Sequence, residues 1–237
     1  MRSSSMALLD RPPLKSGVLL IVLALLTVSV SGCVIATVRT LEEDQGLKAG
    51  FSPEAYVEEI WESRVLPTYR EQAQELSDLL AQLDADEQGT IARFGHRSGT
   101  GPYSFMVRGE GVLTAIDTSS RSGTASVDLN PPDGTPDLTL TIGPLIKISQ
   151  RAGVRDAVGF IQYGNFTNQQ EFAGVANAMG ERIVQHIAAA LGVESPDAIA
   201  EIDPARYVGK SVRFIGAFTL ESRDNVVVVP VELEVGE

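Results

Sequence analysis

The residues that decide the fold run from Tyr103 to Ile142 and read YSFMVRGEGVLTAIDTSSRSGTASVDLNPPDGTPDLTLTI. Apolar and polar side chains alternate along this stretch, which is the pattern of strands that bury one face. Turn sequences at 119–123 and 131–134 divide it, so it predicts three successive strands. The alternation changes parity across 109–111, and we therefore expect a glycine bulge at Gly111 in one long, strongly bent first strand.

A helix and two further strands follow in the C-terminal half. Apolar residues recur at helical spacing from Phe172 to Leu191, and Thr167 is placed to cap this helix, with Gln170 completing a capping box. The alternation returns over residues 211–218 and 227–235, where it predicts the last two strands. The order of elements is therefore strand, strand, strand, helix, strand, strand.

This order is that of the five-stranded OB barrel, in which a helix between strands three and four closes one end. We expect an α+β fold in which an N-terminal helical segment packs on such an OB-like barrel. A different α+β sheet with the same strand order also fits the pattern. In the barrel, side chains from all five strands share one core: Val112, Ile116, Val127, Leu140, Phe214 and Val229.

The N-terminus has the pattern of a bacterial export signal. Basic residues precede an uncharged aliphatic run from Gly17 to Val30, and small residues lead to Cys33, the one cysteine of the chain. The sequence VSGC at residues 30–33 resembles the lipobox of bacterial lipoproteins, which implies that the signal is removed and that Cys33 is lipidated. An uncleaved signal anchor is the alternative, because no charge interrupts residues 17–38 and that length can span a bilayer. Both place the rest of the chain outside the cytoplasm.

These patterns divide the chain into four segments. They are a signal peptide or signal anchor at 1–32, a tether at 33–50, a helical segment ending in a loop at 51–100, and the OB-like domain at 101–237. A serine, proline and glutamate at 52–54 open the first helix, because the serine can cap it and proline suits its first position. Pro67 then predicts a kink or a short break.

Charge and composition exclude several classes of function. The chain carries a formal net charge of −12 over 237 residues, and an acidic surface repels phosphate backbones, so we expect no nucleic-acid partner. With one cysteine and two histidines, His96 and His186, we expect no metal and no cofactor. No pattern places a histidine beside a nucleophile, which favours a non-enzymatic binding or accessory protein. The alternative is an envelope hydrolase with a dispersed site.

The candidate binding residues are neutral and polar. Amide side chains offer paired donors and acceptors that suit sugar hydroxyls, and an aromatic ring offers a stacking face. The alternative is structural: the charged residues form a local ion pair, and the amides cap the helix. The candidates are Arg155, Asp156, Tyr163, Asn165, Asn168 and Gln169.

Several short stretches together carry a resemblance to a known family. They are Phe51-Ser52-Pro53, Gly101 to Phe105, Gly109 to Gly111, Ile142-Gly143-Pro144, Arg155-Asp156-Ala157 and Phe166 to Gln169. From Cys33 to Val235 the chain resembles a domain-of-unknown-function family of predicted periplasmic lipoproteins. The resemblance implies a place in the cell envelope, on the periplasmic or extracytoplasmic face of the membrane. It also implies genes often found beside sugar ABC-transport operons, so the expected partners are the membrane and an ABC transporter or its solute-binding protein. The family has no established catalytic residues to carry over.

Overall fold

The structure is a computed structural model that describes residues 50–222 and 225–236. The export signal and Cys33 therefore lie outside the described residues. Within the described part of the chain, no helix has both the length and the hydropathy needed to cross a membrane.

The described chain begins with a series of short helices, as predicted. They are α3 (Pro53–Ile60), a π-helical turn (Trp61–Val65), α4 (Leu66–Gln72), α5 (Leu76–Ala85) and α6 (Glu87–Phe94). Ser52 caps α3 by accepting a hydrogen bond from the Ala55 N–H at 3.1 Å. The break predicted at Pro67 takes the form of the π-helical turn that precedes it. The loop predicted before residue 101 is wrong at α6, because the Asp86 side chain caps a helix there.

Six strands form one mixed sheet. They are β1 (Gln74–Glu75), β2 (Ser104–Asp117), β3 (Thr124–Leu129), β4 (Leu138–Thr141), β5 (Ser211–Thr219) and β6 (Val227–Val235). The order is β1-β2-β3-β4-β6-β5, and β2 also pairs with β5, so the pairings of the five longer strands form a ring. These five are the predicted strands in the predicted order. The sixth, β1, is a two-residue strand from the helical segment that pairs in parallel with β2.

The predicted bulge at Gly111 is wrong. Every second residue of β2 stays buried from Phe105 to Leu113, through both glycines, and the register with β3 shifts only between Leu113 and Ala115. As a result, Leu113 is buried where Val112 was expected, and Ile116 is only partly buried. Gly111 is needed for another reason: a Cβ there would lie 2.9 Å from the Leu129 Cα, so the glycine lets β2 and β3 approach each other.

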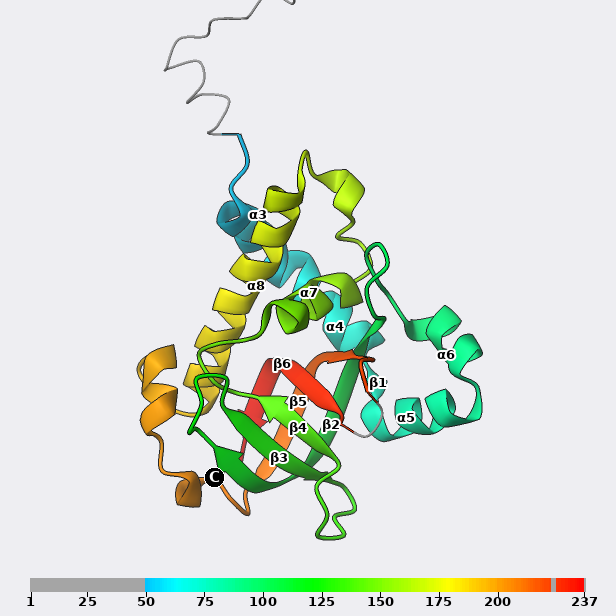
Figure 1. Cartoon of the computed structure of the whole chain (residues 1–237). Coiled ribbons are helices and arrows are strands. Elements are labelled where there is room, and N and C mark those ends of the chain that lie inside the picture. The colour runs from blue at the N-terminus through cyan, green and yellow to red at the C-terminus, as the bar shows by residue number, and fades with distance from the viewer. Residues whose placement is uncertain (1–49, 223–224, 237) are drawn as a thin grey trace, which may run out of the picture. The chain divides into compact units, whose positions relative to one another are not determined.

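Two helices connect β4 to β5, namely α7 (Ile148–Ala157) and α8 (Gln169–Ala190). Figure 1 shows α3 running beside α8, α7 lying across the end of the sheet, and α5 and α6 next to β1. Among residues 50–222 and 225–236 there are also three short 3-10 turns, at Tyr163–Asn165, Pro196–Glu201 and Pro204–Arg206. The predicted cap of α8 is wrong by one residue, because Asn168, not Thr167, accepts the capping hydrogen bond, from the Glu171 N–H at 3.0 Å.

One hydrophobic core joins the sheet to the helices. Four of the six predicted core residues are buried in it: Val127, Leu140, Phe214 and Val229. The helical segment adds Trp61 and Tyr69, both fully buried. The buried residues of this core lie between Val57 and Val231, so residues 49–237 hold a complete core of their own.

Candidate functional site

Arg155 and Asp156 lie together at the end of α7, where they connect three parts of the fold. The Arg155 guanidinium binds the Asp156 carboxylate through Nη2 at 2.7 Å and Nε at 2.9 Å, and its Nη1 donates to the Phe172 carbonyl at 3.1 Å. Its Cζ also lies 3.4 Å from the centre of the Phe172 ring. The other Asp156 oxygen accepts from the Ser98 N–H at 3.4 Å. Burial lowers the pKa of Arg155, and the carboxylate partly offsets this effect.

The amide residues of the predicted site divide into two kinds. Asn168 caps α8, and Asn165 accepts a hydrogen bond from the Gln162 N–H at 2.9 Å, so both have local structural contacts. Gln169 and Tyr163 are exposed, and the Tyr163 ring meets Phe172 edge-on at 5.7 Å. The structural interpretation therefore accounts for Arg155, Asp156, Asn165 and Asn168, whereas ligand binding by the six residues stays a prediction.

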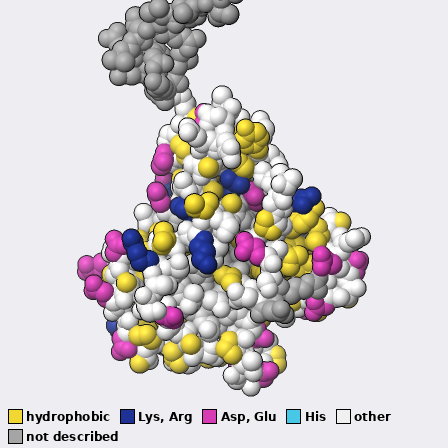
Figure 2. Space-filling model, in the orientation of Figure 1, with side chains coloured by type: hydrophobic (Ala, Val, Ile, Leu, Met, Phe, Trp, Pro, Cys, Tyr) yellow, Lys and Arg dark blue, Asp and Glu magenta, His cyan; other side chains and the backbone are white. Residues whose placement is uncertain are grey.

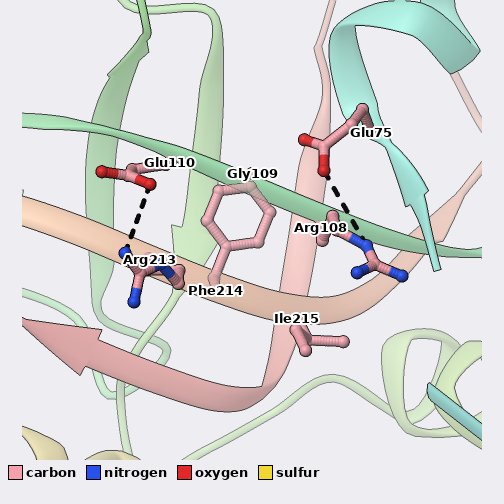
Figure 3. A pocket seen from close by; sticks show the side chains of 7 residues that line it. All are labelled: Glu75, Arg108, Gly109, Glu110, Arg213, Phe214 and Ile215. Carbon is pink, nitrogen blue, oxygen red and sulfur yellow. Dashed lines mark hydrogen bonds and ion pairs between the residues drawn. The ribbon is translucent and has the colours of Figure 1, made fainter. Parts of the chain in front are cut away.

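A groove that the sequence analysis did not predict lies where β1 meets β2 and β5 (Figure 3). Its volume is about 260 Å³. Seven residues line it: Glu75, Arg108, Gly109, Glu110, Arg213, Phe214 and Ile215. The Phe214 ring lies between two ion pairs, with Glu110 and Arg213 on one side and Glu75 and Arg108 on the other.

The register of the sheet places these side chains. Arg108, Gly109 and Glu110 of β2 stand opposite Ile215, Phe214 and Arg213 of β5, and Glu75 stands opposite Arg108. Because directly opposed residues point to the same face, Arg108, Glu110, Arg213 and Ile215 share one surface, whereas Gly109 and Phe214 face the buried side of the sheet. Gly109 makes room for the aromatic ring, since a Cβ there would lie 2.7 Å from the Phe214 Cζ.

Each arginine of the groove is held in place and still reaches solvent. Arg108 donates to the Ala73 carbonyl at 2.8 Å and to the Arg70 carbonyl at 3.0 Å, and its Nε lies 3.9 Å from Glu75. Arg213 contacts Glu110 at 3.4 Å and Glu234 at 3.1 Å. All these charged side chains are about one-third exposed or more. The groove thus offers positioned donors and acceptors beside the partly exposed Ile215, and the buried Phe214 ring lies beneath it.

Three other hollows lie among the described residues, and two of them, of about 320 and 420 Å³, are larger than the groove. One beside β1 includes Glu71, Arg93 and His96, and one near residue 103 includes Arg97 stacked 4.3 Å over Tyr103. A smaller one of about 130 Å³ separates the start of α7 from the residues around 221. His96 and His186 lie in different parts of the fold, the latter stacked on Trp61. Among residues 50–222 and 225–236, no three Cys, His, Asp or Glu side chains are grouped to hold a metal ion.

The profile of a family described as "Predicted periplasmic lipoprotein (DUF2291)" matches residues 21–234. The chain belongs to this family. Membership confirms the predicted location on the periplasmic side of the envelope, as a membrane-associated lipoprotein. A comparison with curated protein sequences gave no match.

A solved structure supports the fold of this lipoprotein. The crystal structure of an OB-fold protein from Thermotoga maritima is 19% identical, with a TM-score of 0.57, and the match covers 78% of this chain and 99% of that one. At this identity the likeness concerns the fold alone. It agrees with the predicted OB-like strand order and with helices between strands three and four.

Proposed function

We propose that this lipoprotein is a non-enzymatic binding protein that takes a small, uncharged polar solute, such as a sugar, in the groove between Arg108 and Arg213. In this role it serves as an accessory to a solute transport system of the envelope. One observation carries the proposal: two arginine–carboxylate pairs line a groove of about 260 Å³ above the buried Phe214 ring. That volume is somewhat smaller than the roughly 300–1,000 Å³ of pockets for drug-sized ligands, so the groove suits a small solute.

The chemistry of the groove suits a polyhydroxylated solute. A hydroxyl group both donates and accepts, so an arginine N–H and a carboxylate oxygen beside each other can bind the same or adjacent hydroxyls. Exposed ion pairs contribute only about 0–1 kcal/mol to stability, so Arg213 can exchange part of its contact with Glu110 for a ligand at low cost. The charges of the two pairs balance, which favours an uncharged solute over an anion.

The buried groups with shifted pKa values support binding over catalysis. Such groups often mark catalytic sites. Here Tyr69, whose pKa burial raises, donates its hydroxyl proton to the Val154 carbonyl at 2.9 Å, and Arg155 is held by Asp156 and Phe172. Both groups serve contacts inside the fold, and neither lines the groove.

Calorimetric titration of residues 49–237 with a panel of monosaccharides and polyols tests the binding role. We expect at least one solute to bind, and Arg213→Gln to weaken it about tenfold or more through the loss of a charge-assisted hydrogen bond. Arg121→Gln is the matched control, because Arg121 is an exposed arginine that pairs with Asp197 away from the groove. Equal effects of the two substitutions, or no binding by any solute, would refute the assignment.

The accessory role needs a separate measurement on the membrane-bound protein. Cross-linking in intact envelopes, followed by purification of the lipoprotein, should recover an ABC transporter or its solute-binding protein. The Arg213→Gln variant should recover less of this partner if solute loading controls the contact. Recovery of envelope proteins unrelated to transport would contradict the role.

A further inference from the structure

Two exposed aliphatic side chains lie three residues apart at the start of α7. Among the described residues four large apolar side chains are strongly exposed, and two of these are Leu145 at 48% and Ile148 at 77%. Single exposed apolar residues are ordinary, but a pair on one short segment indicates a contact surface. Nothing in the proposed solute groove involves this segment.

The backbone that presents these side chains is firmly held. The Leu145 N–H donates to the Arg121 carbonyl at 3.0 Å, and Ile146, between the two exposed residues, is buried in the core. The Gln150 side chain accepts from the Lys147 N–H at 3.1 Å and so begins α7. The aliphatic side chains are therefore presented on a rigid support, which lowers the entropy cost of a contact.

Two cations lie on the same segment as the aliphatic pair. Lys147 adjoins Ile148, and Arg151 lies one helical turn further along α7. Within the described part of the chain neither forms an ion pair with a carboxylate, although Glu221 lines the same small hollow as Lys147. Arg151 is only partly exposed: its stem packs against α8, where a Cβ on Gly180 would lie 2.9 Å from its Cγ, and its Nε is buried, so Lys147 is the exposed cation of the two. Figure 2 shows separate Lys and Arg side chains, interspersed with Asp and Glu, on this face of the molecule.

We propose that this α7 face, consisting of Leu145, Lys147, Ile148 and Arg151, rests on the anionic phospholipid surface of the membrane to which the lipoprotein is tethered. Aliphatic side chains enter the boundary between headgroups and acyl chains, and the cations bind lipid phosphates. The chain as a whole carries a net charge of −12, so other faces are repelled and this face sets the orientation of the domain.

The tether makes a weak contact sufficient. Belonging to a lipoprotein family places the bilayer close to the domain, so docking is an intramolecular event at high effective concentration. With lipidation at Cys33, residues 34–50 span up to roughly 55–60 Å when extended. That reach exceeds the diameter of about 40 Å expected for a compact domain of this size, so the tether allows the α7 face to meet the bilayer.

The single cysteine of the chain makes the test simple. Residues 49–237 contain no cysteine, so Ser149→Cys provides one site for an environment-sensitive fluorophore on the α7 face. Val208→Cys labels an exposed apolar position on a different segment as the matched control. An N-terminal histidine tag holds the fragment on vesicles that contain a small fraction of nickel-chelating lipid, in place of the acyl chains.

On vesicles of phosphatidylglycerol and phosphatidylcholine we expect a blue shift of the label at 149 and no change at 208. Lys147→Gln should lower the docked-to-free ratio about fivefold, because a cation near an anionic surface contributes about 1 kcal/mol. Ile148→Ser should lower it about tenfold through lost apolar burial.

Three outcomes would overturn the proposal. The first is the absence of a blue shift for the label at 149 on the vesicles, and the second is an equal blue shift for the labels at 149 and 208. The third is an equal shift on pure phosphatidylcholine, which would remove the role of the cations. A shift at 149 that appears in solution as protein concentration rises, without vesicles, would assign the face to contact with a second copy of the chain instead.

Discussion

Gly111 gives the sharpest test of how β2 meets β3. In Gly111→Ala the new methyl carbon would lie 2.9 Å from the Asp128 carbonyl carbon and 2.9 Å from the Leu129 Cα. Carbon atoms in contact pack at about 3.5–4.0 Å, so the two strands would have to separate by roughly 1 Å. The neighbouring hydrogen bond from the Asn130 N–H to the Glu110 carbonyl, at 3.0 Å, lies in the path of this movement.

The expected loss of stability is about 3 kcal/mol. Overpacking of a tight interior site costs about 1–3 kcal/mol, and weakening one or two strand hydrogen bonds adds about 1 kcal/mol each. Urea unfolding of residues 49–237, followed by circular dichroism, measures the change. The control is Gly101→Ala, because the nearest atom to its new Cβ is the Ser98 carbonyl oxygen at 3.7 Å. We expect the control to stay within about 0.5 kcal/mol of wild type. A Gly111→Ala protein as stable as the control would show that β2 and β3 are not in close contact here.

Three further predictions concern a cap, a buried phenol and the lipid anchor. Asn168→Ala should lower the free energy of unfolding by about 1 kcal/mol through the lost cap of α8, whereas Thr167→Ala should have a smaller effect; equal losses in urea titrations would contradict the cap assignment. Burial raises the pKa of Tyr69 well above 10.0, so its neutral form stabilises the folded state fully below pH 10.0, and this contribution falls as the pH rises further. Tyr69→Phe should therefore reduce the loss of stability at alkaline pH. An unchanged dependence of the free energy of unfolding on pH would contradict this. Cys33→Ser should abolish labelling by a fatty-acid probe, and a wild-type protein that takes up no label and keeps residues 1–32 would be a signal-anchored protein instead.

The two proposals concern different surfaces of the domain. The solute groove lies on the outer face of β2 and β5, whereas the α7 face is formed by the segment after β4. The Arg213→Gln and Ile148→Ser variants can therefore fail or succeed independently. Loss of solute binding with normal docking would leave the membrane contact intact, and the reverse result would leave the groove intact.

Local patterns were enough to predict much of this fold. The Ser52 cap, the disturbance at Pro67 and the buried stripe of α8 depend on residues a few positions apart, and all three are found. The same holds for the five longer strands, because alternation is a property of each strand by itself. Their order then limited the connections to few alternatives, of which the OB-like one agrees with the solved structure.

Contacts between distant segments could be read only from the tertiary structure. The sequence pattern puts the change in the buried–exposed alternation of β2 at Gly111, whereas in the structure the register shifts after Leu113. Glycine carries no side chain that shows which face of the strand it belongs to. The solute groove was missed for a related reason. Arg108 and Glu110 are ordinary alternating residues until the register sets them opposite Ile215 and Arg213, over 100 positions away.

The sequence by itself determined the helices and strands, their order and the export to the cell envelope, since each depends on short-range periodicity or on a contiguous motif. The tertiary structure decided which polar residues are used inside the fold and which line the groove. For Arg155 and Asp156 the sequence allows either ligand binding or a local ion pair, and the structure shows the ion pair in contact with α8 and the loop at Ser98. The burial of a side chain depends on which distant segments of the chain pack against it, and only the folded structure shows those contacts.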